Sequence, residues 1–582
     1  MQALVTLYSQ RCYDEAERRA RGLTRRFPAD GFGWKALGIV LSESGRPDEA
    51  IEPMQRAVKL LPRDAEAHTN LGSALIDVKR LAEAEISLRC ALAINSDYAL
   101  AHFNLGNVLK EQRRLFEAEM SYRRVLVLKP DYTDVYNNVG NALKDQGHLV
   151  EAASAYRRTL ALRPGFSSAF SNLLFTLNCR NEAVPGIRIA EALRYGETMA
   201  SRVNGRYKDW SCNPNAPRLR IGLVSGDLRK HPVGYFLQSM LGAIDQRRLE
   251  LFAYATSRDA DDLTDTMKPF FSAWTPLLGL DDGAAAARIH ADGIHILIDL
   301  SGHTANNRLP VFAWKPAPVQ ATWLGYFATT GLAEMDYILA DEIGAPPAIR
   351  AQFTEQVWHL PDTRLCFTPP AGAPEISALP ALDNGYVTFG CFQNVAKIGD
   401  AVLAQWKRLL DALPSARLRL QNRSFGDQEV RNQFIQRLRQ HAIDPARVVL
   451  LGPVPRIAYL AAHSEVDLLL DTFAFPGGTT TCESLWMGVP TLTLGGDTLL
   501  ARQGASILTA AGLAEWVATS EDDYLAKAIE FSGNFPRLAA LRGSLREQVS
   551  ATPLFDAPLF AERFQDAMSA MWRVHLSAEI PS

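Results

Sequence analysis

The sequence has 582 residues, of which 47% are hydrophobic and 21% are charged, and its formal net charge is −3. This length and composition predict two to four globular domains and exclude a disordered or fibrous chain. The charge gives no reason to expect nucleic acid or a membrane surface as a partner, and apolar runs such as residues 294–298 are too short to span a bilayer.

Residues 1–177 repeat with a period of 34. The positions that share this spacing are Trp34, His68, His102, Tyr136 and Phe170; Leu37, Leu71, Leu105, Val139 and Leu173; Gly38, Gly72, Gly106 and Gly140; and Ala50, Ala84, Ala118 and Ala152. Each unit has two amphipathic helical patterns whose small residues allow close approach, and Pro130 and Pro164 close two units. The pattern resembles the tetratricopeptide repeat, so we expect an α superhelix with a concave face.

Asparagines also recur at this interval, at Asn70, Asn104, Asn138 and Asn172. Their amides could form a ladder that hydrogen-bonds the backbone of an extended peptide, whatever its side chains are. The alternative is that they only cap or solvate the first helix of each unit. We interpret Asn70, Asn104 and Asn138 as acceptor-binding residues.

The repeat ends near residue 178, and residues 178–217 are expected to form a helical linker. Short apolar strands then alternate with helices in two blocks, residues 218–367 and 386–582, separated by a Pro-rich linker at 368–385. The expected strands are 219–225, 251–256, 294–300, 319–325 and 336–341 in the first block and 386–392, 417–422, 447–452, 466–473 and 490–495 in the second. Two Rossmann-like lobes are therefore predicted, with a cleft at the carboxyl ends of the strands and terminal helices in the second lobe.

In the first block, Asp227 and His231 follow the first strand in the segment VSGDLRKHPVGYF. A histidine near its intrinsic pKa beside a carboxylate can accept a proton from an attacking hydroxyl. The alternative is a solvated loop histidine.

In the second block, FGCFQNVAKI places Lys397 after the first strand, with Gln393 and Asn394 as amide donors. Lys397 would provide a cation for a leaving pyrophosphate, or else it is a surface lysine. Arg456 and Tyr459 follow a later strand and could pair with phosphate or ribose and stack on a base.

The strongest candidate site is the segment LLLDTFAFPGGTTTCESLWMG, residues 468–488. Gly477 and Gly478 would let the backbone approach a ligand, and a helix expected to begin near Cys482 would direct N–H groups at an anion. Glu483 could accept hydrogen bonds from ribose hydroxyls. The alternative is an ordinary strand–helix turn with threonine caps.

These motifs, with HPVGYF and APVQATWLGYFATTG (317–331) behind a repeat array, resemble the O-linked N-acetylglucosamine transferase family, glycosyltransferase family 41. The resemblance implies two lobes in the GT-B arrangement and inverting, metal-independent transfer from UDP-N-acetylglucosamine to Ser or Thr of intracellular proteins. It implies these roles: Asn394, Lys397, Thr479 and Thr480 at the pyrophosphate, Glu483 at the ribose, Val454, Arg456 and Tyr459 at the nucleoside, and Asp227 and His231 in proton transfer. Glu483 and Gly478 stand where animal members have Asp and His, which bears on the choice of sugar.

Two alternatives remain: a related transferase with another nucleotide sugar, such as an O-fucosyltransferase, or a repeat scaffold with an inactive transferase body. Lys397, the threonine pair and Glu483 disfavour the scaffold. Asp259-Ala260-Asp261 is a D-x-D pattern, but its charged surroundings favour a solvated surface segment, so no metal or other cofactor is expected.

The seven cysteines are scattered and include no Cys-x-x-Cys pair. This disfavours a disulfide framework or a zinc site and favours a reducing compartment. The first residues, MQALVTLYSQRCYDEAERR, also lack the pattern of a secretory signal, so we expect a cytoplasmic protein.

Overall fold

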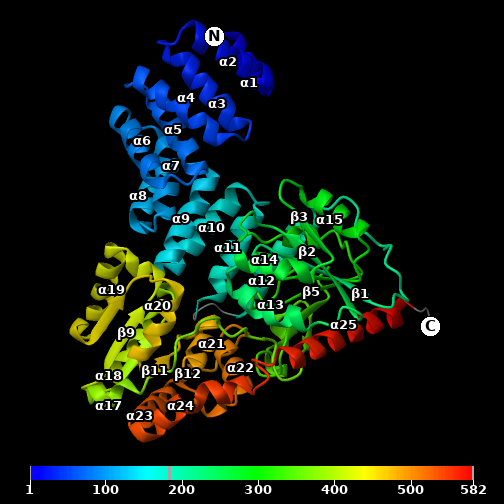
Figure 1. Ribbon diagram of the computed structural model, residues 1–582, viewed down its shortest axis with the longest axis vertical. Coiled ribbons are helices and arrows are strands. Elements are labelled where there is room, and N and C mark those ends of the chain that lie inside the picture. The colour runs from blue at the N-terminus through cyan, green and yellow to red at the C-terminus, as the bar shows by residue number, and fades with distance from the viewer. Residues whose placement is uncertain (1, 181–184, 580–582) are drawn as a thin grey trace. The chain divides into compact units, whose positions relative to one another are not determined.

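The computed structural model describes residues 2–180 and 185–579. The chain divides into two compact units, with the boundary between residues 163 and 164 (Figure 1). The first unit contains only helices, and the second contains two parallel β-sheets with covering helices. Across the described residues, no helix is both long enough and apolar enough to cross a membrane.

The first unit is a stack of helix pairs. Its helices are α1 (Gln2–Ser9), α2 (Tyr13–Arg26), α3 (Gly31–Glu43), α4 (Pro47–Leu60), α5 (Ala65–Asp77), α6 (Leu81–Ile94), α7 (Ala99–Glu111), α8 (Leu115–Leu128), α9 (Thr133–Gln146) and α10 (Leu149–Leu162). The first helices of successive pairs begin at Gly31, Ala65, Ala99 and Thr133, which confirms the 34-residue period. Pro130 and Pro164 lie just beyond α8 and α10, where they were expected to end a helix.

The repeated glycines lie where two helices of a pair touch. A Cβ added to Gly106 would lie 2.5 Å from Cε1 of Tyr122, and one added to Gly72 would lie 2.7 Å from Cγ of Leu88. Tyr122 and Leu88 are fully buried, so neither can move aside into solvent. The close helix approach predicted from the small residues is therefore confirmed.

We expect Gly106→Ala to lower the stability of the first unit by about 1–3 kcal/mol, because overpacking against the Tyr122 ring outweighs the better helix propensity of alanine. Gly22 in α2 is the matched control, since a Cβ there meets nothing within 4 Å. Gly22→Ala should leave stability unchanged or raise it. Calorimetric unfolding of both variants measures the difference, and equal transition temperatures would contradict this packing argument.

The second unit begins with α11 (Ser167–Asn178) and α12 (Pro185–Ala200). α12 agrees with the helix expected in the linker, whose residues 181–184 lie outside the described residues. α11 continues the repeat spacing, and the sequence analysis placed most of this helix, up to residue 177, in the superhelix. Its side chains instead pack on the following lobe, where Ser171 Oγ lies 3.0 Å from His303 Nδ1 and the Phe175 ring contacts Phe327.

The first lobe contains a seven-stranded parallel sheet in the order β3-β2-β1-β4-β5-β6-β7. Its strands are β1 (Leu219–Ser225), β2 (Leu249–Ala255), β3 (Ala273–Pro276), β4 (Ile296–Asp299), β5 (Val319–Thr322), β6 (Tyr337–Ala340) and β7 (Gln356–His359). Its helices include α13 (Pro232–Ala243), α14 (Asp262–Met267), α15 (Asp282–Ala291) and α16 (Leu309–Phe312). The five strands predicted here are confirmed, and the sequence reasoning missed β3 and β7.

The second lobe contains a six-stranded parallel sheet in the order β10-β9-β8-β11-β12-β13. Its strands are β8 (Thr388–Cys391), β9 (Arg417–Gln421), β10 (Val448–Leu451), β11 (Leu468–Leu470), β12 (Thr491–Leu494) and β13 (Val517–Ala518). Its helices are α17 (Pro380–Asn384), α18 (Asp400–Ala412), α19 (Gln428–Gln440), α20 (Arg456–Ala461), α21 (Thr479–Trp486), α22 (Gln503–Ala510), α23 (Glu521–Ser532) and α24 (Phe535–Ser550). Two such lobes after the repeats make the predicted superhelix-plus-GT-B architecture.

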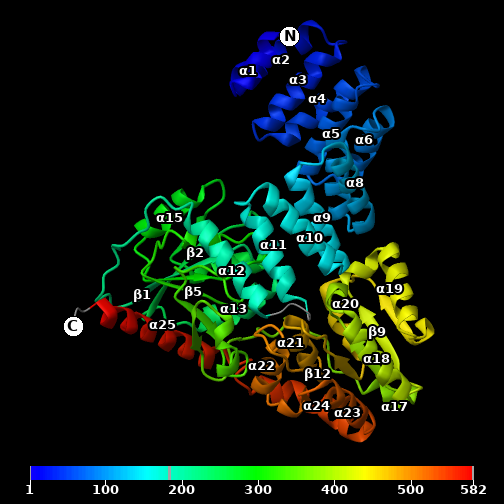
Figure 2. The same cartoon turned by 180° about the vertical axis from the view of Figure 1, so that it is seen from behind.

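The last helix, α25 (Ala557–Glu579), differs from the expectation that the terminal helices belong to the second lobe. Figures 1 and 2 show it in red along the green first lobe. Its apolar face joins the core of that lobe, and Phe560 and Phe564 lie 6.0 and 5.3 Å from the buried Trp323 ring. The chain therefore returns to the first lobe after completing the second.

Candidate functional site

The Gly-rich segment of the second lobe forms the turn between β11 and α21. α21 begins at Thr479 and not near Cys482, because Gly478 ends the turn and accepts the first helical hydrogen bonds, from Thr481 N and Cys482 N at 3.1 Å. The N–H groups of Thr479 and Thr480 precede these bonds and have no helical partner. The Thr479 hydroxyl is buried and has no hydrogen-bond partner within the described residues. The turn therefore offers several donors to an anion.

Asp471, at the carboxyl end of β11, holds this turn in shape. Its Oδ1 accepts hydrogen bonds from Gly477 N at 2.7 Å and Thr472 N at 3.0 Å, and its Oδ2 accepts one from the Thr493 hydroxyl at 2.9 Å. The side chain is 1% exposed, and burial raises its pKa to about 6. The nearby Lys397 charge and these hydrogen bonds oppose the rise and stabilise the carboxylate.

Lys397 ends the 3₁₀ turn Val395–Lys397 that follows β8. Its Nζ donates to the carbonyl of Pro476 at 3.0 Å and lies 3.7 Å from the centre of the Phe475 ring. Burial lowers the pKa of Lys397 to about 8, while the Asp471 charge acts in the opposite direction. The predicted cation therefore lies at the Gly-rich turn, which excludes the surface-lysine interpretation.

Of the two neighbouring amides, Gln393 contacts the turn and Asn394 does not. Gln393 Nε2 donates to Thr480 Oγ1 at 2.9 Å and to Asp471 Oδ1 at 3.2 Å. Asn394 is exposed, and its side-chain oxygen caps its own turn by accepting from Ala396 N at 3.0 Å. Its contacts are thus with its own turn, and its role at the pyrophosphate stays a prediction.

Glu483, Tyr459 and Arg456 form one cluster beside this turn. Glu483 is 2% exposed, and its Oε2 accepts a hydrogen bond from the Tyr459 hydroxyl at 2.8 Å while its Oε1 pairs with Arg456. Burial raises the pKa of Glu483, and Arg456 opposes that shift. Val454 lies 43% exposed in the connection between β10 and α20. Of the residues expected around a nucleoside, the structure therefore brings together Glu483, Tyr459 and Arg456.

On the first lobe, Asp227 lies buried after β1, and His231 is the N-cap residue of α13. His231 Nδ1 lies 3.5 Å from Asp227 Oδ2. Burial raises the pKa of Asp227 and lowers that of His231, so both shifts favour the uncharged forms. A neutral imidazole held beside a carboxyl group is suited to accept a proton.

The two lobes meet beside these groups. Tyr235, one turn after His231 in α13, lies with its ring 5.0 Å from the guanidinium of Arg456. Arg456 in turn pairs with Glu483 of α21. The His231 end of the first lobe therefore adjoins the nucleoside cluster of the second.

The asparagine series of the first unit is buried or partly buried. Asn104 is 9% exposed, Asn138 Nδ2 donates to Asn107 Oδ1 at 3.2 Å, and the buried Asn70 Nδ2 has no partner within the described residues. Asn138 is thus partly engaged with the neighbouring helix pair, whereas Asn70 retains a donor. Binding of an acceptor by this series stays a prediction.

The D-x-D pattern has local structural roles. Asp261 caps α14 and accepts a hydrogen bond from Lys230 N at 2.8 Å, and Asp259 pairs with Arg229 at 3.2 Å. Within residues 2–180 and 185–579, no group of three or more His, Cys, Asp or Glu side chains is arranged to hold a metal ion. Metal independence stays a prediction.

Comparison with known proteins identifies the family. The model of glycosyl transferase family 41 matches residues 198–367 and 378–564, and a tetratricopeptide-repeat model matches 1–60, 35–99 and 103–167. The chain belongs to glycosyl transferase family 41. Its match to the solved structure of a Thermobaculum terrenum O-GlcNAc transferase mutant has a TM-score of 0.83 and 32% identity, and it covers 88% of this chain and 98% of that one.

Among curated family 41 relatives, the chain is 38% identical over 418 residues to a Petunia hybrida protein, which covers 70% of this chain and 44% of that one. That relative is described as a probable UDP-N-acetylglucosamine–peptide N-acetylglucosaminyltransferase, SPINDLY. The enzyme described as UDP-N-acetylglucosamine–peptide N-acetylglucosaminyltransferase in Caenorhabditis elegans is 25% identical over 478 residues, covering 62% of this chain and 41% of that one. The chain thus spans less than half the length of these relatives.

Sequence reasoning missed Asp471 and Gln503 of this family 41 site. Asp471 had a visible signal, since it directly follows the apolar strand that enters the Gly-rich turn. Gln503 had none, because it begins α22 and approaches Gly477 only in the folded chain, with Nε2 3.2 Å from the Gly477 carbonyl.

Proposed function

We propose that this family 41 chain transfers N-acetylglucosamine from UDP-N-acetylglucosamine to Ser or Thr hydroxyls of proteins, with inversion at the anomeric carbon. The observation that carries the proposal is the turn at 477–480, whose free donors face an anion site that also contains Lys397. The descriptions of the relatives as UDP-N-acetylglucosamine–peptide transferases support this donor and this class of acceptor. The repeats would hold the acceptor protein, and the cytoplasm is the proposed compartment.

The mechanism is a single in-line displacement. The acceptor oxygen bonds to the anomeric carbon while the bond from that carbon to the phosphate oxygen breaks, and UDP leaves with the electron pair. Lys397, the Thr479 and Thr480 groups and the amino end of α21 stabilise the negative charge of the leaving UDP. The hydroxyl proton passes to His231, and the Asp227 carboxyl group, 3.5 Å from His231 Nδ1, stabilises the imidazolium that forms.

Glu483 binds the ribose hydroxyls in this proposal. Both of its oxygens have partners in the structure, Tyr459 and Arg456. A ribose hydroxyl would therefore share or replace one of these contacts, and Arg456 would then be available to the phosphates.

Calorimetric titration with UDP-N-acetylglucosamine and with GDP-fucose tests the donor, and mass spectrometry of an incubated lysate tests transfer to protein. We expect binding of the UDP-sugar only, and addition of N-acetylhexosamine that persists in excess EDTA. Selective binding of GDP-fucose would favour the O-fucosyltransferase alternative, and binding of neither would favour an inactive scaffold. Loss of activity in EDTA would contradict the metal-independent mechanism.

The pKa of Lys397 predicts the alkaline limb of the pH profile. Because burial lowers this pKa to about 8, the charged ammonium form prevails below that pH and is lost as pH rises through it. Since kcat/KM reports the free enzyme, it should fall as pH rises above about 8. Lys397→Arg should remove this limb, because arginine stays charged. An unchanged alkaline limb in that variant would assign it to another group.

A further inference from the structure

A second polar side chain besides Lys397, Gln503 of the second lobe, reaches the Gly-rich turn and is itself hydrogen-bonded from the first lobe. Residues 497–506 of the second lobe hydrogen-bond to the first lobe in four places. These are Gln352 Nε2 to Asp497 O at 2.7 Å, Arg502 Nε to Ile343 O at 2.6 Å, Ser506 Oγ to Asp341 Oδ2 at 2.7 Å and Arg364 Nη2 to Gln503 Oε1 at 3.0 Å. We call these four bonds the lobe seam.

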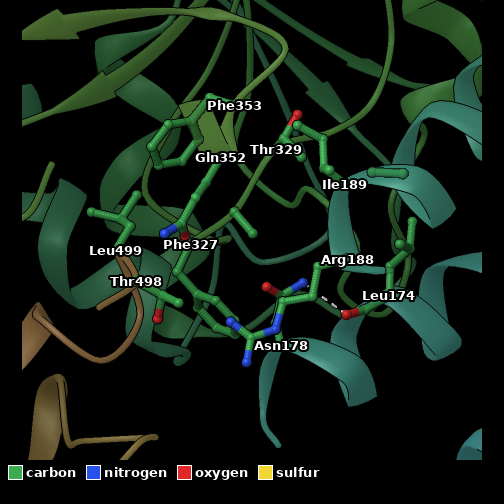
Figure 3. A pocket seen from close by; sticks show the side chains of 12 residues that line it. Leu174, Asn178, Arg188, Ile189, Phe327, Thr329, Gln352, Phe353, Thr498 and Leu499 are labelled. Carbon is green, nitrogen blue, oxygen red and sulfur yellow. Dashed lines mark hydrogen bonds between the residues drawn. The ribbon is translucent and has the colours of Figure 1, made fainter. Parts of the chain in front are cut away.

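Figure 3 shows one end of this seam, where Gln352 and Thr498 line a cavity with Arg188 and Asn178. The cavity measures about 20 Å³, which is room for about one water molecule. This end of the seam is therefore closely packed, and a substrate cannot enter it. The other end, at Gln503, adjoins the Gly-rich turn.

Arg364 is an unusual residue in this seam because its cation is buried with little compensation. Its side chain is 1% exposed, and its Nε has no hydrogen-bond partner within the described residues. Burial lowers the pKa of Arg364, and only the Asp341 charge opposes the shift. Such a cation is costly to fold, so a role beyond stability is expected.

The contact with Arg364 determines which way the Gln503 amide points. A guanidinium can only donate hydrogen bonds, so it must face the amide oxygen of Gln503. The amide nitrogen is then directed at the turn, where one N–H donates to the Gly477 carbonyl at 3.2 Å. A Cβ on Gly478 would lie 2.9 Å from this nitrogen. The second N–H of Gln503 therefore lies against the start of α21 and has no partner within the described part of the chain.

We propose that Gln503 is a further diphosphate-binding residue of the donor site and that Arg364 is the residue that positions it. The proposal rests on the proposed function. Gln503 supplies an N–H donor beside those of Thr479 and Thr480, and Arg364 prevents the amide from flipping. Because Arg364 belongs to the first lobe, the diphosphate site is complete only when the two lobes are docked.

Gln503→Glu separates this role from a merely structural one. The carboxylate has the same shape and pairs better with buried Arg364, so the melting temperature should stay the same or rise. It offers no N–H to the turn and places a negative charge beside the diphosphate. We therefore expect the Kd for UDP, measured by calorimetry on the full chain, to rise about tenfold or more.

Arg502→Met is the matched control, since it removes another bond of the seam without touching the turn. Its Kd for UDP should stay within about twofold of the parent value. Arg364→Met should weaken UDP binding, and Arg364→Lys should weaken it less. Adding Arg364→Met to Gln503→Glu should weaken UDP binding little further, because both substitutions act through the side-chain amide of Gln503.

Three results would overturn the proposal. If Gln503→Glu bound UDP as tightly as the parent, the seam would be only a structural contact. The same conclusion would follow if Arg502→Met weakened binding as much as Gln503→Glu does. Additive effects of the Arg364 and Gln503 substitutions would overturn the positioning role of Arg364. If the parent chain itself bound no UDP, both the proposed function and this proposal would be wrong. Titration of the parent alone detects that outcome, so it is distinguished from failure of the Gln503 role.

Discussion

Replacing Lys397 with alanine is expected to lower kcat by about 100- to 1,000-fold, because a preorganised donor to a developing negative charge contributes on this scale. The ammonium group lies at the Pro476 carbonyl and over the Phe475 ring, next to the Gly-rich turn. Because charge on the departing UDP is greatest in the transition state, kcat should fall more than the affinity for the donor does. Steady-state kinetics with UDP-N-acetylglucosamine and an acceptor protein measure both quantities.

The fold should survive this change. Lys397→Met keeps the length and the contact with Phe475, so it isolates the charge from the packing. We expect both variants to melt near the parent temperature and to share the loss of kcat. Near-parent turnover in either variant would show that Lys397 does not act on the leaving group.

Replacing Asp471 with alanine is expected to lower both stability and donor binding. The change leaves Gly477 N and Thr472 N without their acceptor and removes the charge that raises the pKa of Lys397 most. Loss of one buried, multiply hydrogen-bonded carboxylate should lower the free energy of unfolding by about 3 kcal/mol or more. The turn that holds Thr479 and Thr480 would also lose its shape, so UDP binding should become undetectable.

Asp467 provides the matched control for Asp471. It is equally buried and accepts hydrogen bonds from Ala381 N and Thr388 N, both at 2.8 Å, at the opposite end of β11. Asp467→Ala should lower the unfolding temperature by a similar amount and leave the Kd for UDP of the folded protein unchanged. If the two variants lost UDP binding equally, the effect of Asp471 would be one of stability alone.

The strands that sequence reasoning missed share one property. β3, β7 and β13 are edge strands of their sheets, whereas most predicted strands are interior. Interior strands of a parallel sheet are covered on both faces and form continuous apolar runs. β3 (Ala273–Pro276) is only partly buried and ends in proline, and β13 has two residues, so neither carries such a run.

The order of residues along the chain determined which groups follow each strand, because a parallel sheet brings the carboxyl ends of its strands to one edge. On that basis Lys397, the threonine pair and the Gly-rich turn could be assigned to one site. The sequence could not show that Gln393 contacts the Gly-rich turn while Asn394 caps its own turn. The two adjacent side chains take different directions only once the 3₁₀ turn at Val395 forms.

The 34-residue helical repeat, the two parallel sheets and the residues beside the Gly-rich turn could all be predicted from the sequence, because each depends on local periodicity or on position after a strand. The folded chain was needed to show that α11 and α25 pack on the first lobe, because an apolar helix face in a sequence does not indicate which neighbour will cover it. The tertiary structure also decided that Arg364 reaches the turn through Gln503, 139 residues away along the chain. Such contacts depend on how the two lobes dock, and no residue spacing in the sequence shows which side chains will meet between the lobes.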